Sequence, residues 1–297
     1  MKKIIVAGAG GFVGSSLVKR LLKEDVQIWA VDTYFQKDAL PVSEKLKILP
    51  VKSNNAEMIE MFHDGSFDSF YNLAWQGVNG PDKAKYDVQI NNIMLTLRYA
   101  ELAKSLGCSK YLCAGTVAEC AMDSLSGLQT TSGGMMYSAA KVSSHLILET
   151  YCKNTGMDFV WMQFSNIYGP ENKTGNLISY TIEQIKQGKP AVFGPAAQLY
   201  DFIYVDDLIE AICRLGIVKT EGNHYFIGSG TPRVLKDYLT KVGELCGRLD
   251  LIRIGERPDD GIKYTYDMMD NTRTVEAIGN YVSDSFENHI KYTIDHY

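Results

Sequence analysis

The sequence predicts an α/β fold with a doubly wound parallel sheet, and the first 32 residues carry the strongest indication. An apolar segment, residues 4–7, leads into a glycine-rich turn at residues 8–14. An amphipathic segment, residues 15–23, then predicts a helix, and a second apolar segment, residues 26–31, ends at Asp32. Strand, glycine turn, helix and strand in this order are typical of a unit that binds a dinucleotide.

The same alternation continues to about residue 170. We expect further strands at 46–51, 69–74, 110–115 and 159–164, and helices at 56–62, 82–105 and 137–153. Helical crossovers between strands imply a parallel sheet that is covered on both faces. The sequence therefore predicts a Rossmann-type domain over residues 1–170 and a smaller substrate-binding lobe over 171–297. A segment at about 201–217 is expected to return to the first domain.

The glycine turn contains residue types that a dinucleotide site requires. Gly8 permits a tight turn, Gly11 lets the backbone approach a pyrophosphate, and Gly14 lets the helix pack close to the strand. Asp32 can accept hydrogen bonds from both adenosine ribose hydroxyls and repels a 2′-phosphate, which predicts NAD as the cofactor rather than NADP. The residues of the turn expected to contact the cofactor are Gly8, Gly11, Phe12, Val13 and Gly14.

Composition excludes several other classes of protein. The net charge of −5 argues against binding to nucleic acid or to an anionic membrane, because both require a basic face. The apolar N-terminal segment is too short for a secretion signal or a membrane span. The six cysteines have neither paired nor zinc-type spacing, so reduced thiols in a cytoplasmic protein are expected. The five histidines show no metal spacing, and we expect no metal.

A second pattern concerns catalysis. Tyr137 and Lys141 are four residues apart in a predicted helix and therefore share one face. A tyrosine with a pKa of about 10 is a poor base at neutral pH. The Lys141 cation and a positive nicotinamide ring would favour the phenolate and lower that pKa. The phenolate could then take a proton from a sugar hydroxyl while the nicotinamide accepts a hydride. Thr116, which ends the strand 110–115, could reach the same substrate oxygen.

Each of these residues also has a purely structural alternative. An exposed helical pair would explain Tyr137 and Lys141, and a helix or turn cap would explain Thr116. The catalytic interpretation depends on the glycine turn upstream, which makes a cofactor site the expected context.

Further motifs run along nearly the whole chain, from about residue 2 to residue 285. They are Asn72-Leu73-Ala74-Trp75, the segment from Asn92 to Thr96, Asn166-Ile167-Tyr168-Gly169-Pro170, Gly188-Lys189-Pro190, residues 201–207, and Arg257-Pro258. Together with the glycine turn and Tyr-x-x-x-Lys, they resemble the extended short-chain dehydrogenase/reductases of the NAD-dependent sugar-nucleotide epimerase/dehydratase family.

This resemblance implies roles for individual residues. Thr116, Tyr137 and Lys141 would form the catalytic triad, and Lys141 would also hold the nicotinamide ribose. Additional cofactor contacts would come from Leu73, Ala74, Trp75 and Asn92. The substrate pocket would be lined by Trp75, Thr116, Asn166, Asn176, Gln198, Tyr200 and Arg257. The helices 82–105 and 137–153 would form the four-helix interface of a homodimer.

Departures from the family pattern bear on the reaction. In the dehydratases that resemble this chain, an Asp-Glu pair follows the threonine, whereas here Val117 and Ala118 follow Thr116. Without that acid and base, 4,6-dehydration is not expected. Glu119 stands where the family has an apolar residue.

Two family arginines are also replaced, by Gln163 and by Tyr200. Tyrosine offers one hydrogen bond and no charge. Three explanations remain open: Arg257 holds the diphosphate, the phosphate chain lies differently, or the substrate is not a nucleoside diphosphate.

The leading hypothesis is an NAD-dependent epimerase of a nucleotide sugar that works through a transient 4-keto intermediate. The alternative is an NAD(P)H-dependent reductase of a 4-keto-6-deoxy nucleotide sugar, which would use the same triad and release its cofactor. A third hypothesis is a non-catalytic protein that senses NAD, since a fold alone does not determine function.

Overall fold

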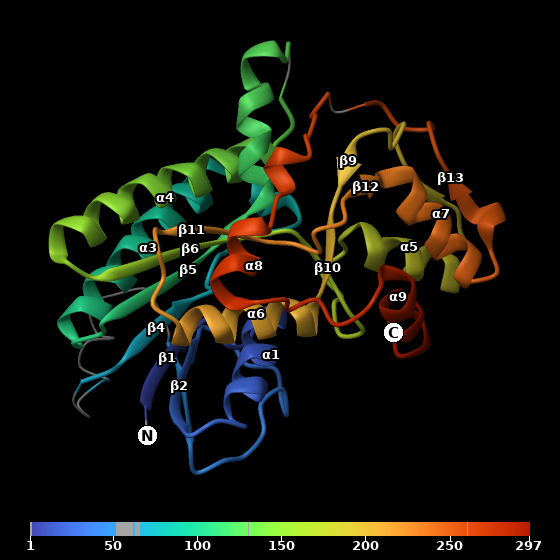
Figure 1. Cartoon of the computed structure of the whole chain (residues 1–297). Helices are drawn as coiled ribbons and strands as arrows, with labels where there is room; N and C mark the ends of the chain where they lie inside the picture. Colours follow the sequence, from blue (N-terminus) through green and yellow to red (C-terminus); the bar gives the residue numbers. More distant parts are fainter. Residues whose placement is uncertain (1, 52–61, 63–65, 130, 260) are drawn as a thin grey trace.

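The protein is described by a computed structural model that covers residues 2–51, 62, 66–129, 131–259 and 261–297. A seven-stranded sheet lies at its centre, in the order β11-β6-β5-β4-β1-β2-β3 (Figure 1), and all its strands are parallel. The strands are β1 (Lys2–Ala7), β2 (Val26–Asp32), β3 (Leu46–Pro50), β4 (Ser69–Asn72), β5 (Lys110–Thr116), β6 (Asp158–Phe164) and β11 (His224–Ile227). The strand order reverses at β1, and such a switch point is where sheets of this kind bind ligands.

Helices cover both faces of the sheet (Figure 1). The helices α3 (Tyr86–Ser105) and α4 (Gly134–Thr155) cover one face, and α1 (Phe12–Leu21) and α6 (Val205–Ile217) cover the other. The side chains of β1 alternate between the two cores. Those of Ile4 and Val6 pack with α1 and α6, and those of Ile5 and Ala7 pack with α3 and α4. Burial on both faces explains why this strand is a continuous apolar run.

The predicted α/β fold with a parallel sheet is confirmed. The six strands expected in the first half are present as β1 to β6, with ends displaced by at most two residues. The helix expected over 56–62 lies almost wholly outside the described residues.

The helix predicted over 82–105 is divided, which corrects the sequence interpretation. A 3-10 turn, η1 (Pro81–Ala84), precedes α3, and Lys85 between them is extended, with φ −84° and ψ 116°. The turn packs against the start of α4 so closely that a Cβ on Gly133 would overlap the Ala84 side chain. This tertiary contact, rather than helix propensity, determines the local conformation.

The second half of the chain builds short elements beside the sheet (Figure 1). The helices are α5 (Leu177–Lys186), α7 (Leu235–Leu245), α8 (Thr272–Ile278) and α9 (Phe286–Asp295). Three two-stranded sheets pair β7 (Asn166–Tyr168) with β10 (Phe202–Tyr204), β9 (Leu199–Tyr200) with β12 (Arg233–Val234), and β8 (Ala191–Val192) with β13 (Ile252–Arg253).

The segment 201–217 forms a strand and a helix, and its helix α6 packs on α1. The strand β11, which sequence analysis did not foresee, extends the main sheet beside β6. The division of the chain at residue 170 stays a prediction. Within the described residues, none of the helices combines the length and the apolar character needed to cross a membrane.

The glycine turn brings three backbone segments into direct contact. Gly8 has φ +82°, a region that favours glycine, and a Cβ there would lie 2.6 Å from the Leu73 carbonyl carbon and from the Ala74 nitrogen. A Cβ on Gly14 would overlap the Gly8 carbonyl oxygen. The first turn of α1 therefore rests on the backbone at the end of β1, which itself rests on the segment that follows β4.

We expect Gly14→Ala to destabilise the protein by about 1–3 kcal/mol, because the added methyl group must displace backbone. Urea unfolding measures the difference. Gly11→Ala is a matched control, since a Cβ at Gly11 would meet only the Gly8 oxygen, at an ordinary 3.4 Å. Equal stability of the two variants would contradict the packing argument.

Candidate active site

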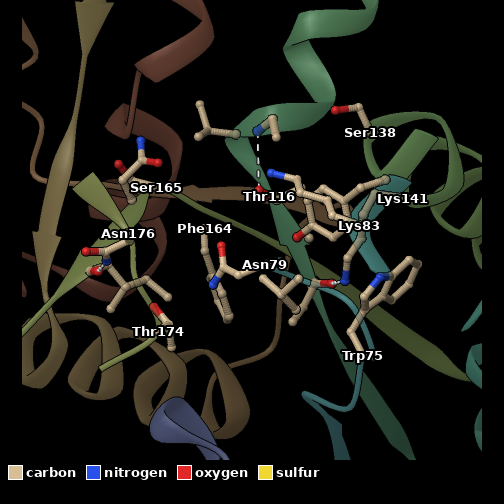
Figure 2. Close-up of a pocket in the computed structure, with 18 of the residues that line it drawn as sticks. Trp75, Asn79, Lys83, Thr116, Ser138, Lys141, Phe164, Ser165, Thr174 and Asn176 are labelled. Atoms are coloured by element: carbon tan, nitrogen blue, oxygen red, sulfur yellow. Dashed lines mark hydrogen bonds between the residues drawn. The ribbon is translucent and has the colours of Figure 1, made fainter. Parts of the chain in front are cut away.

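A cavity of about 540 Å³ opens at the carboxyl ends of β1, β4, β5 and β6, where the sheet faces the second half of the chain (Figure 2). Parallel sheets bind ligands at this edge. Most of the predicted site residues line it. They are Gly8, Gly11, Phe12, Val13, Gly14, Leu73, Trp75, Thr116, Tyr137, Lys141, Asn166, Asn176 and Tyr200.

The glycine turn fits the pyrophosphate of a dinucleotide. Gly11 is the N-cap of α1 without a side-chain cap, so the first N–H groups of the helix are left for a ligand. A Cβ at Gly11 would have open space except toward the Gly8 oxygen, so a phosphate can reach the backbone here. Asp32 accepts hydrogen bonds from the Gly10 nitrogen (2.8 Å) and the Thr33 nitrogen (2.7 Å). The Asp32 carboxylate, at the end of β2, therefore fixes the backbone of the glycine turn at Gly10.

Three of the predicted cofactor residues, Asp32, Ala74 and Asn92, are not part of the described wall of this cavity, and the contact of Asp32 with a ribose stays a prediction. The amide of Asn92 donates to the Gln76 carbonyl oxygen (2.7 Å) and accepts from the Gln76 nitrogen (3.0 Å). The Ala74 nitrogen donates to the Asn72 side chain at 3.1 Å. These bonds hold the loop that carries Trp75, and a direct contact between Asn92 or Ala74 and the cofactor stays a prediction.

The predicted triad converges in the cavity. Thr116 ends β5 and caps η2 (Val117–Gly127), where its hydroxyl accepts from the Ala118 nitrogen at 3.3 Å. Tyr137 and Lys141 lie on α4, are 5% and 3% exposed, and both line the cavity. Lys141 is seen beside Thr116 in Figure 2. The Lys141 ammonium donates to the Ala114 carbonyl oxygen at 2.7 Å and lies 3.6 Å from the centre of the Trp75 ring.

The electrostatics of Tyr137 differ from the sequence expectation. Burial raises the pKa of the phenol, although a hydrogen bond with the Thr116 side chain opposes the rise. The Lys141 nitrogen lies 5.9 Å from the centre of the Tyr137 ring and is engaged by Ala114. In the protein chain alone, burial therefore dominates and keeps the phenol neutral.

Lys83 is a cavity residue that sequence analysis missed. Its ammonium lies 5.0 Å from the centre of the Tyr137 ring, and burial lowers its pKa. Figure 2 shows Lys83 among the side chains that line the cavity. The residue sits in the 3-10 turn that replaces the start of the predicted helix. No signal in the sequence marks it, because only the packing of η1 against α4 turns it toward Tyr137. Other lining residues that were not foreseen are Asn79, Ser165, Asn172, Thr174, Ile262 and Tyr264.

A second cavity, of about 270 Å³, adjoins the first and shares Tyr200, Ile262 and Tyr264 with it. Gln198 and Arg257, both predicted substrate residues, line this second cavity. Arg257 donates to the Tyr180 hydroxyl at 3.2 Å. Among the described residues of its wall, Arg257 is the only lysine or arginine.

The two predicted asparagines of the substrate pocket are bonded to backbone. The Asn166 amide donates to the Asp201 carbonyl oxygen at 3.0 Å. Asn176 caps α5 by accepting from the Ser179 nitrogen (2.9 Å), and it donates to the Ile167 carbonyl oxygen (2.7 Å). They hold the rim of the cavity in place, and their contact with a substrate stays a prediction.

The chain belongs to the NAD dependent epimerase/dehydratase family, whose model matches residues 4–228. This membership confirms the resemblance and NAD as the cofactor. The chain is 23% identical to a UDP-glucose 4-epimerase of Mycolicibacterium smegmatis, over 93% of this chain and 92% of that protein. It is 28% identical to a UDP-glucuronate 4-epimerase of Thermodesulfobacterium geofontis, over 69% and 68%.

Solved structures agree on the fold. A UDP-glucose 4-epimerase of Thermotoga maritima with UDP-glucose superimposes with a TM-score of 0.83 at 20% identity, covering 99% of this chain and 98% of that one. A dTDP-glucose 4,6-dehydratase of Streptomyces venezuelae with NAD and TYD bound also gives 0.83, at 19% identity, covering 99% and 96%. Because the epimerase and the dehydratase have the same TM-score against this chain, the fold does not distinguish between the two reactions.

Proposed function

We propose that the protein is an NAD-dependent 4-epimerase of a nucleotide sugar. The observation that carries the proposal is the convergence of Thr116, Tyr137 and Lys141 on one cavity whose wall, directly after Thr116, is Val117 and Ala118. The triad supports removal and return of hydrogen at a sugar carbon. The two apolar side chains leave no carboxylates at the positions where the dehydratases of the family carry their acid and base.

Each residue of the triad has a separate task. Tyr137 takes the proton of the 4-hydroxyl and returns it, while the Thr116 hydroxyl hydrogen-bonds the same oxygen. Lys141 supplies a positive charge that is held near the phenol by the Ala114 carbonyl. NAD, when bound, supplies a reversible hydride acceptor and a positive ring that favours the phenolate. Transient oxidation to a 4-keto sugar and reduction from the other face invert the configuration at that carbon.

Names of relatives support a uridine nucleotide as the first substrate class to test, because curated relatives are a UDP-glucose and a UDP-glucuronate 4-epimerase. The second cavity would hold the nucleotide, with Arg257 as its cation and Tyr200 where the family has an arginine.

A reductase of a 4-keto-6-deoxy nucleotide sugar is the second candidate, and the replacement of two family arginines fits it as well as it fits the epimerase. Tyr200 and Gln163 replace two family arginines, which indicates a divergent substrate. A relative with 25% identity over 79% of this chain is a CDP-abequose synthase of Salmonella muenchen. Reductase and epimerase share the triad and differ in whether the cofactor leaves after each cycle.

We also propose a homodimer through α3 and α4. Both helices carry large apolar side chains on their outer surfaces, with Ile90 55%, Met94 47% and Leu146 59% exposed. Apolar side chains grouped on neighbouring helices favour association.

The protein purified without added cofactor is expected to release NAD, close to one per chain, when it is denatured. Chromatography and mass spectrometry identify the nucleotide. Retained NAD is expected because an epimerase regenerates it in every cycle. An empty protein that binds added NADH or NADPH would favour the reductase, and preference for NADPH would also contradict the assignment of Asp32.

Tyr137→Phe is expected to retain NAD and to lose turnover by about 10²- to 10⁴-fold, the usual contribution of a general acid–base group. Conversion of UDP-glucose and UDP-glucuronate measures the loss. Tyr292→Phe, a change at a 50% exposed tyrosine on α9, is the control and should retain activity. Near-parental turnover of Tyr137→Phe would refute the proposed chemistry, and measurable turnover of the parent would exclude a purely NAD-sensing protein.

Leu146→Arg is expected to convert the dimer into a monomer, because it places a charge in the proposed apolar interface. Light scattering after size-exclusion chromatography measures the mass. Leu249→Arg, at a leucine of η3 (Leu249–Leu251) that is 48% exposed, is the control. A parent protein with the mass of one chain would contradict the proposal.

A further inference from the structure

One buried acid beside the triad is not used by the proposed chemistry. Glu119 is 7% exposed and does not belong to the described wall of the cavity. One carboxylate oxygen accepts from the Thr116 nitrogen at 2.6 Å, and the other accepts from the Trp161 indole nitrogen at 3.1 Å. The carboxyl group thus holds the backbone of the catalytic threonine from behind.

The neighbouring sequence accommodates this acid. A Cβ on Gly115 would lie 2.8 Å from the Glu119 carboxylate and would overlap the Trp161 indole nitrogen. Only glycine at position 115 leaves room for the bond between Glu119 and Trp161. The small size of Gly115 thus makes room for the hydrogen bond between Glu119 and Trp161. An apolar residue at position 119 would leave the indole nitrogen without this partner.

The charges around Glu119 come from several elements. Lys141 of α4 is the nearby cation, and burial lowers its pKa to about 8, although Cys113 and Glu119 oppose the fall. Tyr137 of α4 has its pKa raised by Glu119 in addition to burial. Burial raises the pKa of the Cys113 thiol of β5 to about 12, so this group is neutral. Cys120 and Asp123 lie on the same 3-10 segment, and burial raises the pKa of Cys120 to about 11.

Two histidines lie behind the indole. The His145 ring of α4 stacks on Trp161 with centroids 4.7 Å apart, and its pKa is lowered to about 4 by burial. The ring of His224 stacks on His145 at 5.4 Å, and burial lowers the pKa of His224. Both rings are neutral near pH 7. Burial raises the pKa of the Glu119 carboxyl itself to about 7, although the Thr116 nitrogen, Lys141 and the Trp161 indole favour its charged form.

We propose that Glu119 is a positioning residue of the triad, whose carboxylate orients Thr116 and holds the charge of Lys141. The inference rests on the proposed function, because it assigns Glu119 a part in how Thr116, Tyr137 and Lys141 work together. Because Glu119 is not part of the described cavity wall, it acts through the residues around it, Thr116, Lys141 and Trp161.

A definite pH effect follows from the sign of the charge. A carboxylate stabilises the Lys141 ammonium and destabilises the Tyr137 phenolate, so it raises both pKa values. The working state needs the phenolate and the ammonium together. The charge of Glu119 acts above a pH of about 7, the value to which burial raises its pKa. In that range, loss of the carboxylate moves the limb set by Tyr137 and the limb set by Lys141 in the same direction, toward lower pH.

The decisive comparison uses two variants that differ only in charge. Glu119→Gln alone would set its amide N–H groups against the Trp161 N–H. Trp161→Phe removes that donor and keeps the carboxylate, whereas Glu119→Gln with Trp161→Phe removes both. We expect kcat/KM of the double variant to have its pH profile about one unit lower than that of Trp161→Phe, the scale expected for a nearby charge.

A second readout needs no substrate. The ultraviolet titration of the NAD-bound protein, minus that of its Tyr137→Phe counterpart, reports the ionisation of Tyr137. Its midpoint should fall in the double variant relative to Trp161→Phe. If the double variant does not fold, Glu119→Gln and Glu119→Asp carry the test. Aspartate keeps the charge and should retain the parental profile with lower kcat, whereas glutamine should shift it.

The outcomes separate this inference from the proposed function. Reduced activity with an unmoved profile and an unmoved Tyr137 midpoint would overturn the role of Glu119 and leave a purely structural one. Near-parental turnover of Tyr137→Phe would overturn the proposed function, while the titration of Tyr137 would still decide whether Glu119 controls its ionisation.

Discussion

The backbone contact between Gly14 and Gly8 is the constraint on which the rest of the site depends. It lets α1 begin directly at the end of β1, so that the free N–H groups of the helix face the switch point of the sheet. Gly8 in turn lies against the backbone of Leu73 and Ala74. The ends of β1 and β4 are thereby held at one rim, and a side chain in place of either glycine would separate them.

Buried polar groups hold the loop after β4, which carries Trp75 in the cavity wall. Trp75 donates from its indole to Gln89 of α3 at 2.9 Å, and Asn92 of the same helix bonds the backbone of Gln76. Gln89 and Asn92 are 1% and 3% exposed. Burying a polar group costs free energy unless the group is hydrogen-bonded, and both of these side chains are hydrogen-bonded. The loop after β4 is thus fixed by helix α3, and Trp75 is presented to Lys141 in a defined orientation.

Much of the site was predictable because it follows strand ends. Thr116 ends an apolar run, and Tyr137 and Lys141 share a helical face, so their convergence follows from local periodicity and the parallel topology. Lys83 was not predictable, because the helix expected from residue 82 is broken by contact with α4. The partner of Glu119 was not predictable either, although the residue stands in an apolar segment where the family has an apolar residue. Its bond to Trp161 joins residues 42 positions apart.

The sequence by itself determined the class of fold, the position of the glycine turn, the choice of NAD and the identity of the three candidate catalytic residues. Those features depend on short-range patterns: continuous apolar runs for strands buried on both faces, a helical repeat of four, and glycine where the backbone must turn or make close contact. Only the tertiary structure decided which polar side chains face the cavity and which support it from behind. The ionisation of Tyr137, Lys141 and Glu119 was likewise a tertiary outcome. The burial of a side chain and the charges around it depend on segments that are distant in the chain, so a local sequence pattern cannot predict them.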